Sequence, residues 1–175
     1  MIQIINTGVA NIRSLQAAFD RLGCAWDLTV SAEEIESASH IVLPGVGAFA
    51  AATQSIDQLG LRNAIIDRIN RLESPTLCIC LGMQLLCESS EESKLAKGLG
   101  IIPHAITRFG DKVKIPQLGW NEVRPLNNGP FTTGEAYFAN SYRLETAPDG
   151  WGAAETNYGG KFISSIWRGR TLACQ

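Results

Sequence analysis

The sequence has few histidines, little excess of either charge and no long apolar run. Its 175 residues carry 15 Lys and Arg against 17 Asp and Glu, giving a formal net charge of −2. The basic residues do not cluster, so nothing favours binding to nucleic acid. No apolar stretch approaches the ~20 residues that a membrane span needs. Residues 1–5 lack the basic flank and cleavage site of a signal peptide, so we expect none.

The histidine and cysteine contents disfavour metal sites and disulfide frameworks. The only histidines, His40 and His104, are far apart, so we expect no metal site, and no cofactor is indicated. The five cysteines are an odd number with no Cys-x-x-Cys pair, which favours reduced thiols in the cytoplasm. The length suits one domain over residues 1–175.

Short apolar runs alternate with helical patterns in the first half of the chain. We expect strands at residues 1–5, 26–30, 40–43 and 77–80, and helical patterns opening at Asn11, Ser31, Leu61 and Leu81, the last reaching Cys87. This alternation predicts an α/β fold with an open mixed, mainly parallel sheet and helices on both faces. Runs at 136–142, 162–167 and 171–174 predict an antiparallel extension in the C-terminal half. Residues 89–94 are expected to form a polar surface loop.

Two turns follow apolar strands, where ligands bind in open α/β sheets. The turn at 44–47, Pro-Gly-Val-Gly, could present backbone N–H groups to a ligand or be a plain connection. At the second turn, Cys80 stands between a strand and a helical pattern, as in a nucleophile elbow, although most free cysteines are buried packing residues. We expect the helix N-terminus to lower the pKa of Cys80. The Leu81 N–H and the 44–47 turn would be the two oxyanion donors.

The run Cys80-Leu81-Gly82-Met83-Gln84 resembles the Cys-x-Gly-x-Gln nucleophile motif of class I (triad) glutamine amidotransferases. The surrounding residues resemble, within that family, the glutaminase subunits of imidazole glycerol phosphate synthases in histidine biosynthesis. The other matching stretches, in chain order, are Thr7–Asn11, Pro44–Gly47, Gly98–Ile102, Gly119–Asn121, Tyr137–Phe138, Ser141–Tyr142 and Asn157–Gly159. The similarity spans the whole chain.

The resemblance implies a class I amidotransferase fold, which is flavodoxin-like, and a glutaminase. Cys80 would be the nucleophile, with the oxyanion held at Gly47 and Leu81. The residues that would bind L-glutamine are Gln84, Ser141 and Tyr142. The residues expected on the partner face are Asn11, Trp120 and Asn121. The partner would be a TIM-barrel cyclase subunit, forming a heterodimer that channels ammonia and makes imidazole glycerol phosphate and an aminoimidazole carboxamide ribonucleotide.

Several positions depart from the family pattern. Cys78 stands where the family usually has Gly, and Gln117 and Asn140 stand where it usually has His. In the family, Phe-His-Pro-Glu follows the residue matching Gln175 and supplies the triad's His and Glu. We therefore expect the natural protein to continue with such a segment, and the 175-residue chain to be inactive as a glutaminase.

Three alternatives to this function stay open. The chain could serve another class I amidotransferase, for anthranilate, GMP or pyridoxal phosphate synthesis. It could be a catalytically silent regulatory subunit. A Cys-dependent α/β-hydrolase is a less favoured function, because Cys78 breaks the Gly-x-Cys-x-Gly pattern.

Overall fold

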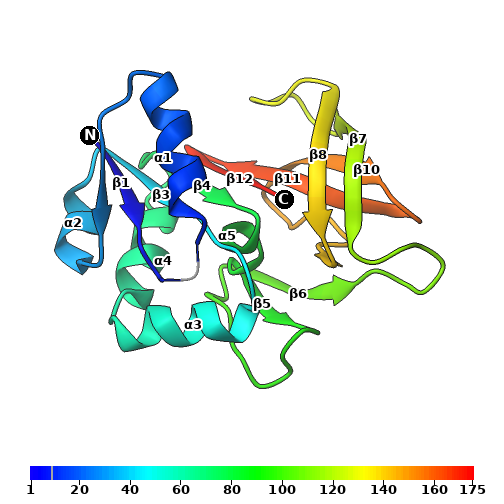
Figure 1. Ribbon diagram of the computed structural model, residues 1–175, viewed down its shortest axis with the longest axis horizontal. Coiled ribbons are helices and arrows are strands. Elements are labelled where there is room, and N and C mark those ends of the chain that lie inside the picture. The colour runs from blue at the N-terminus through cyan, green and yellow to red at the C-terminus, as the bar shows by residue number, and fades with distance from the viewer. Residues whose placement is uncertain (9) are drawn as a thin grey trace.

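The computed structural model describes residues 1–8 and 10–175 (Figure 1). Val9, in the matched N-terminal turn, lies outside the described residues. The helices are α1 (Ile12–Arg21), α2 (Ala32–Ser37), α3 (Phe49–Gln58), α4 (Arg62–Asn70) and α5 (Leu81–Gln84). The strands are β1 (Ile2–Ile5), β2 (Trp26–Thr29), β3 (His40–Leu43), β4 (Thr76–Ile79), β5 (Cys87–Ser90), β6 (Ile102–Arg108), β7 (Gln117–Pro125), β8 (Gly134–Asn140), β9 (Tyr142–Arg143), β10 (Gly152–Asn157), β11 (Lys161–Arg168) and β12 (Thr171–Cys174).

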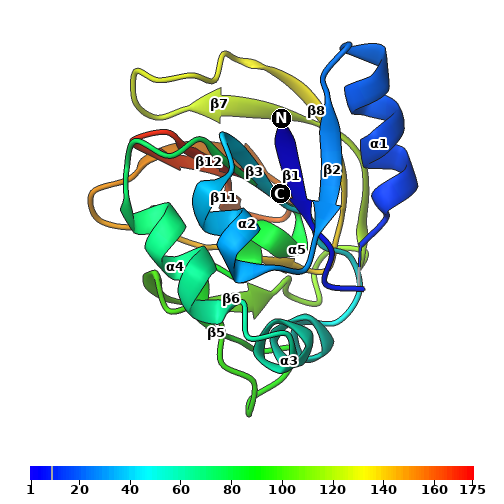
Figure 2. The same ribbon diagram turned by 90° about the vertical axis from the view of Figure 1, so that its left-hand side faces the viewer.

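A nine-stranded sheet in the order β2-β1-β3-β4-β12-β11-β10-β7-β8 forms the centre of the molecule. Its strands are parallel from β2 to β12, whereas β12 to β8 pair antiparallel. Helix α1 lies on one side of the parallel part, and α2 and α4 lie on the other (Figure 2). The predicted α/β fold, with a parallel core and an antiparallel extension, is confirmed.

Helices α1 and α2 begin at the positions that the sequence predicts, and a capping side chain precedes each of them. The Asn11 side chain accepts the Ser14 N–H at 3.4 Å, and the Ser31 hydroxyl accepts the Glu34 N–H at 3.3 Å. Gly23, after α1, takes a left-handed φ of 66° that suits the residue following a helix. These residues therefore determine where α1 begins and ends and where α2 begins.

The core forms between the sheet and the helices that cover it. Ile5 of β1, Leu43 of β3 and Cys78 of β4 are fully buried, as are Phe49 of α3 and Ile65 of α4. They belong to one continuous apolar cluster that extends to Leu81. This packing supports the carboxyl ends of β3 and β4 from beneath, so the turns that follow these strands rest on a rigid base.

Three predicted segments differ from the structure. The helix expected from Leu81 to Cys87 ends at Gln84, because Cys87–Ser90 pairs in parallel with β6 in a second, three-stranded sheet, β5-β6-β9. The strand expected at 136–142 divides at Ser141, with β8 in the large sheet and β9 in the small one. The loop expected at 89–94 therefore begins as strand. Ser141 is the residue at which the chain passes between the two sheets.

Across residues 1–8 and 10–175, none of the helices has the length and apolar character required to cross a bilayer.

Candidate active site

Cys80 occupies a sharp turn between β4 and α5. Its φ is 54° and its ψ is −111°, and no other non-glycine residue among those described has a positive φ. Its backbone N–H donates to the Cys174 carbonyl at 2.7 Å, which continues the pairing of β4 with β12. The turn leaves Cys80 half-buried at the carboxyl end of the sheet. This is the strained geometry of a nucleophile elbow, as the sequence predicts.

Glycines let α5 approach the neighbouring strand closely. A Cβ at Gly82 would overlap the Leu43 carbonyl oxygen, and one at Gly45 would lie 2.8 Å from the Leu81 Cβ. Gly47 has a φ of 84°, in the left-handed region that favours glycine. The 44–47 turn thus lies against the start of α5, next to Cys80.

The predicted catalytic and glutamine-binding residues meet in one cavity of about 210 Å³. The sequence-predicted residues that line it are Gly47, Cys80, Leu81, Gln84, Ser141 and Tyr142. It is also lined by Val46, Glu92, Ala139 and Asn140. The three-stranded sheet brings two of these residues together. Tyr142 lies on β9 and Glu92 follows β5, and β5 and β9 are the strands on either side of β6. Residues far apart in sequence therefore surround the thiol.

Burial raises the pKa of the Cys80 thiol, although the Leu81 N–H and the Gln175 carboxamide act in the opposite direction. The expected net lowering of the Cys80 pKa is therefore wrong, although the Leu81 N–H at the start of α5 acts in the expected direction. Desolvation disfavours the charged form of the thiol, and it is the largest influence on this pKa.

Glu92 is a site residue that the sequence analysis missed. Its Oε2 accepts the Phe49 N–H at 2.6 Å, at the start of α3, while the side chain borders the cavity. The contact joins residues 43 positions apart in the sequence, so no local sequence pattern indicates it. It places a carboxylate in the lining of the cavity that Cys80 also borders.

The other cysteines lie in different surroundings. Cys78 is fully buried beneath the site, and burial raises its pKa strongly. Cys87 is buried as well, with a pKa raised to about 12. Cys174, expected to be a packing residue, is half-buried beside Cys80 on β12, and burial raises its pKa to about 11. Of Cys78, Cys80, Cys87 and Cys174, only Cys80 borders the polar cavity.

The residues expected on the partner face lie on two elements, Asn11 at the start of α1 and the other two on β7. Asn11, at the start of α1, borders a second, apolar cavity of about 270 Å³ that also reaches Cys80. Trp120 on β7 is 67% exposed and stacks edge-on against Tyr137 of β8, with ring centroids 5.7 Å apart. The Asn121 side chain instead bonds to Gln117, whose Nε2 donates to its Oδ1 at 2.8 Å.

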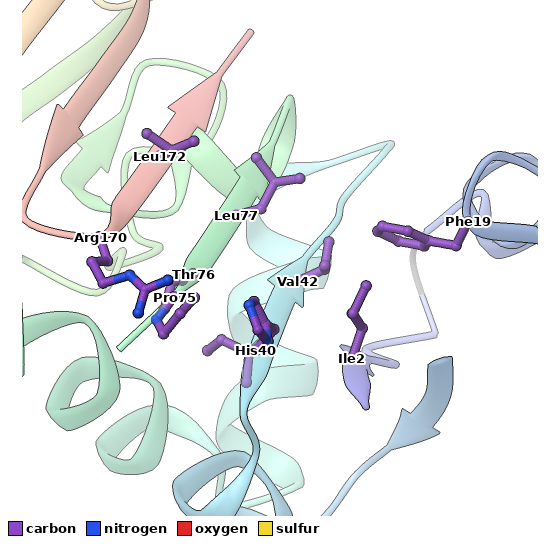
Figure 3. A pocket seen from close by; sticks show the side chains of 10 residues that line it. Ile2, Phe19, His40, Val42, Pro75, Thr76, Leu77, Arg170 and Leu172 are labelled. Carbon is purple, nitrogen blue, oxygen red and sulfur yellow. The ribbon is translucent and has the colours of Figure 1, made fainter. Parts of the chain in front are cut away.

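Both histidines lie away from Cys80. His40, the first residue of β3, borders an apolar cavity of about 220 Å³ at the amino ends of β3 and β4, as predicted from its place in the sequence (Figure 3). In Figure 3, Phe19 of α1 reaches toward Val42 in that cavity. His104 lies on β6. Neither histidine borders a cavity that contains Cys80, within the part of the chain that the structure describes.

Comparison with known proteins agrees with this geometry. The family model described as glutamine amidotransferase class-I matches residues 3–170. The chain is 38% identical over 99% of its length to "Imidazole glycerol phosphate synthase subunit HisH" of Moorella thermoacetica, covering 85% of that protein. It is 37% identical over its full length to the protein of the same name from Dehalococcoides mccartyi strain CBDB1, covering 87% of it.

Two further comparisons extend the range of relatives. The Arabidopsis thaliana protein "Imidazole glycerol phosphate synthase hisHF, chloroplastic" is 34% identical over the full chain, which covers 31% of that longer protein. A crystal structure described as a glutamine amidotransferase shares the fold, with a TM-score of 0.76 at 16% identity, over 99% of this chain and 87% of the other. The match to the family model over residues 3–170, together with these identities, shows that the chain belongs to the class-I glutamine amidotransferase family.

Proposed function

We propose that this chain belongs to the glutaminase subunit of an imidazole glycerol phosphate synthase and carries its nucleophile; that subunit hydrolyses L-glutamine to glutamate and ammonia. The observation that carries the proposal is the strained elbow at Cys80, which opens into a polar cavity shared with Gly47 and Leu81. The full-length similarity to proteins named as subunits of that synthase supports the choice of this activity within the family.

The cavity suits nucleophilic attack on a carboxamide. Cys80 Sγ attacks the γ-carbonyl carbon of glutamine, and the carbonyl oxygen becomes an oxyanion that accepts hydrogen bonds from the Leu81 and Gly47 N–H groups, both residues lining the same cavity. The C–N bond then breaks, the thiol proton leaves with the nitrogen as ammonia, and a thioester remains on Cys80. Water hydrolyses the thioester to glutamate and restores the thiol.

The rest of the cavity suits the amino-acid end of glutamine. The Glu92 carboxylate offers a counter-charge for the α-ammonium group. Gln84, which is 7% exposed, and Ser141 offer polar groups for the α-carboxylate. A substrate held at both ends places its carboxamide at Cys80, which supports glutamine over a simple amide.

An exposed apolar face beside the cavity supports a protein partner. Leu118 and Trp120 of β7 face Tyr137 and Ala139 of β8 across the pairing, and we call these four residues the hairpin patch. All four are exposed, and Ala139 also borders the Cys80 cavity. A TIM-barrel cyclase docked on the hairpin patch and near Asn11 would receive neutral ammonia without releasing it to water. We place this assembly in the cytoplasm.

The test is labelling of a full-length preparation of the protein with an electrophilic glutamine analogue such as 6-diazo-5-oxonorleucine, followed by peptide mapping. We expect the label on Cys80, competed by L-glutamine and absent from Cys80→Ser. Cys174→Ser is the matched control, because it removes a neighbouring thiol, and should label normally. Preferential labelling of Cys78 or Cys174 would contradict the assignment of the nucleophile.

Co-purification identifies the synthase. A tagged chain should retain a cyclase that makes imidazole glycerol phosphate when supplied with ammonia. Retention of an anthranilate, GMP or pyridoxal phosphate synthase instead would assign the chain to another member of the family.

A further inference from the structure

The side chain of Asn140 braces the backbone where the chain passes from the large sheet to the small one. Asn140 is the last residue of β8, is 6% exposed and borders the Cys80 cavity. Its Nδ2 lies 2.9 Å from the Tyr142 carbonyl oxygen. Because a carbonyl only accepts hydrogen bonds, the NH₂ end of the amide must face Tyr142. One buried amide therefore spans Ser141 and holds the backbone on both sides of it.

The bond to Tyr142 is the only hydrogen bond that the Asn140 side chain makes among the described residues. Gln117 of β7 lies directly opposite Asn140 and is fully buried, but its Nε2 donates to Asn121 Oδ1 and its Oε1 has no partner. The Asn140 Oδ1 is buried without a partner as well. Burial of an amide oxygen without a donor is unfavourable. The contribution of this side chain is therefore its single bond to the Tyr142 carbonyl.

The segment that this bond holds offers donors rather than acceptors to the cavity. The Ser141 carbonyl accepts the Phe109 N–H at 3.1 Å, and the Tyr142 carbonyl accepts from Asn140. Within residues 1–8 and 10–175, the Ser141 N–H donates to no backbone carbonyl, and the Ser141 hydroxyl is a second donor at the same residue. A carboxylate only accepts, so Ser141 suits the α-carboxylate of glutamine.

We propose that Asn140 is a positioning residue for glutamine binding, which acts through the Tyr142 carbonyl to hold the donors of Ser141 in place for the α-carboxylate. The inference rests on the proposed function, which puts the amino-acid end of glutamine in this cavity. Without the bond, the segment from 140 to 142 has more conformations to lose when the substrate binds, and this cost weakens binding. The chemical step at Cys80 does not depend on the bond.

The test is the kinetics of Cys80 labelling by 6-diazo-5-oxonorleucine, which carries the α-carboxylate of glutamine, in a full-length preparation of the protein. The concentration that gives half the maximal rate reports binding, and the maximal rate reports the chemical step. Asn140→Leu, nearly the same size but without a donor, should raise this concentration by about threefold to tenfold and leave the maximal rate within about twofold. Asn140→His, whose ring N–H can donate to the same carbonyl, should bind as the wild type does. Asn128→Leu is the matched control, because Asn128 is exposed between β7 and β8.

Protection of Cys80 from iodoacetamide identifies the part of glutamine that is involved. L-glutamine should protect the thiol better than L-glutamine amide, in which a carboxamide replaces the α-carboxylate, and Asn140→Leu should reduce this difference. The rate with iodoacetamide alone should not change, because this small reagent needs no glutamine site. That rate also shows whether the elbow at Cys80 is still folded, and Asn140→Ala takes the place of Asn140→Leu if it is not.

Two results would overturn the inference. One is the same half-maximal concentration of 6-diazo-5-oxonorleucine in the wild type and in the folded Asn140 variant that lacks the donor. The other is an equal loss of protection by L-glutamine and by L-glutamine amide in that variant. Failure of the wild type to take the label at Cys80 would instead contradict the proposed function, so the two failures are distinguishable.

Discussion

Backbone strain at Cys80 is the clearest feature at the scale of the single residue. A side-chain-bearing residue with positive φ is destabilised by about 1–3 kcal/mol relative to an unstrained one, and persists only where its surroundings impose it. Here the surroundings are the β4–β12 pairing before the residue and the contact of Gly82 with Leu43 after it. The strain turns the thiol out of the sheet and toward the cavity.

Relief of that strain can be measured with two substitutions at one position. Cys80→Gly should be more stable to denaturant than Cys80→Ala by about 1 kcal/mol, because glycine adopts positive φ freely. Both variants lack the thiol, so neither should take the glutamine-analogue label. Chemical denaturation of the pair isolates the backbone effect. If Cys80→Ala proved the more stable, the elbow would not be strained.

Gly82 gives a second prediction at residue scale. Gly82→Ala would push a Cβ into the Leu43 carbonyl oxygen, so we expect a loss of roughly 2–4 kcal/mol of unfolding free energy as α5 moves away from β3. Gly110→Ala is the control, because a Cβ there meets nothing within 4 Å and its φ is not left-handed. Denaturation midpoints of both variants supply the comparison. Equal midpoints would mean that α5 does not need to approach β3 so closely.

The elements of the first half show what local sequence can predict. The caps at Asn11 and Ser31 act within three residues, and the buried strands carry continuous apolar runs, so both are visible in the sequence. The end of α5 is not, because Cys87–Ser90 is strand only through its pairing with β6. The pKa of Cys80 also depends on its burial by distant segments, which explains why its expected direction is wrong.

Helix α3 depends on such a distant contact. Ala48 precedes the helix and has no side chain to cap it, so the Glu92 carboxylate accepts the first N–H instead. Glu92→Ala should lower the unfolding free energy by about 1 kcal/mol and weaken labelling by the glutamine analogue. Glu88→Ala, exposed and without a side-chain hydrogen bond among the described residues, is the control for the loss of charge. Wild-type stability together with wild-type labelling in Glu92→Ala would remove Glu92 from both roles.

At the scale of the whole molecule, β12 joins the parallel and the antiparallel parts of the large sheet. It is parallel to β4, which carries the elbow, and antiparallel to β11, which leads through β10 to the β7–β8 hairpin. In Figure 1 the hairpin stands beside the parallel part rather than beneath it. The antiparallel extension thus carries the hairpin patch to the same end of the molecule as the Cys80 cavity, where Ala139 belongs to both.

This arrangement predicts that Trp120 anchors the association with the cyclase. Its ring is 67% exposed and held edge-on by Tyr137, so a partner could bury it without first ordering it. Truncation of a central aromatic anchor typically weakens binding by about 2 kcal/mol or more, which is roughly thirtyfold in Kd. We therefore expect Trp120→Ala to weaken cyclase binding by about thirtyfold in calorimetry, with labelling of Cys80 unchanged. Leu22→Ala, 72% exposed at the opposite end of α1, should bind normally. Tight binding by Trp120→Ala would move the docking face away from the hairpin patch, toward the turn that carries Asn11.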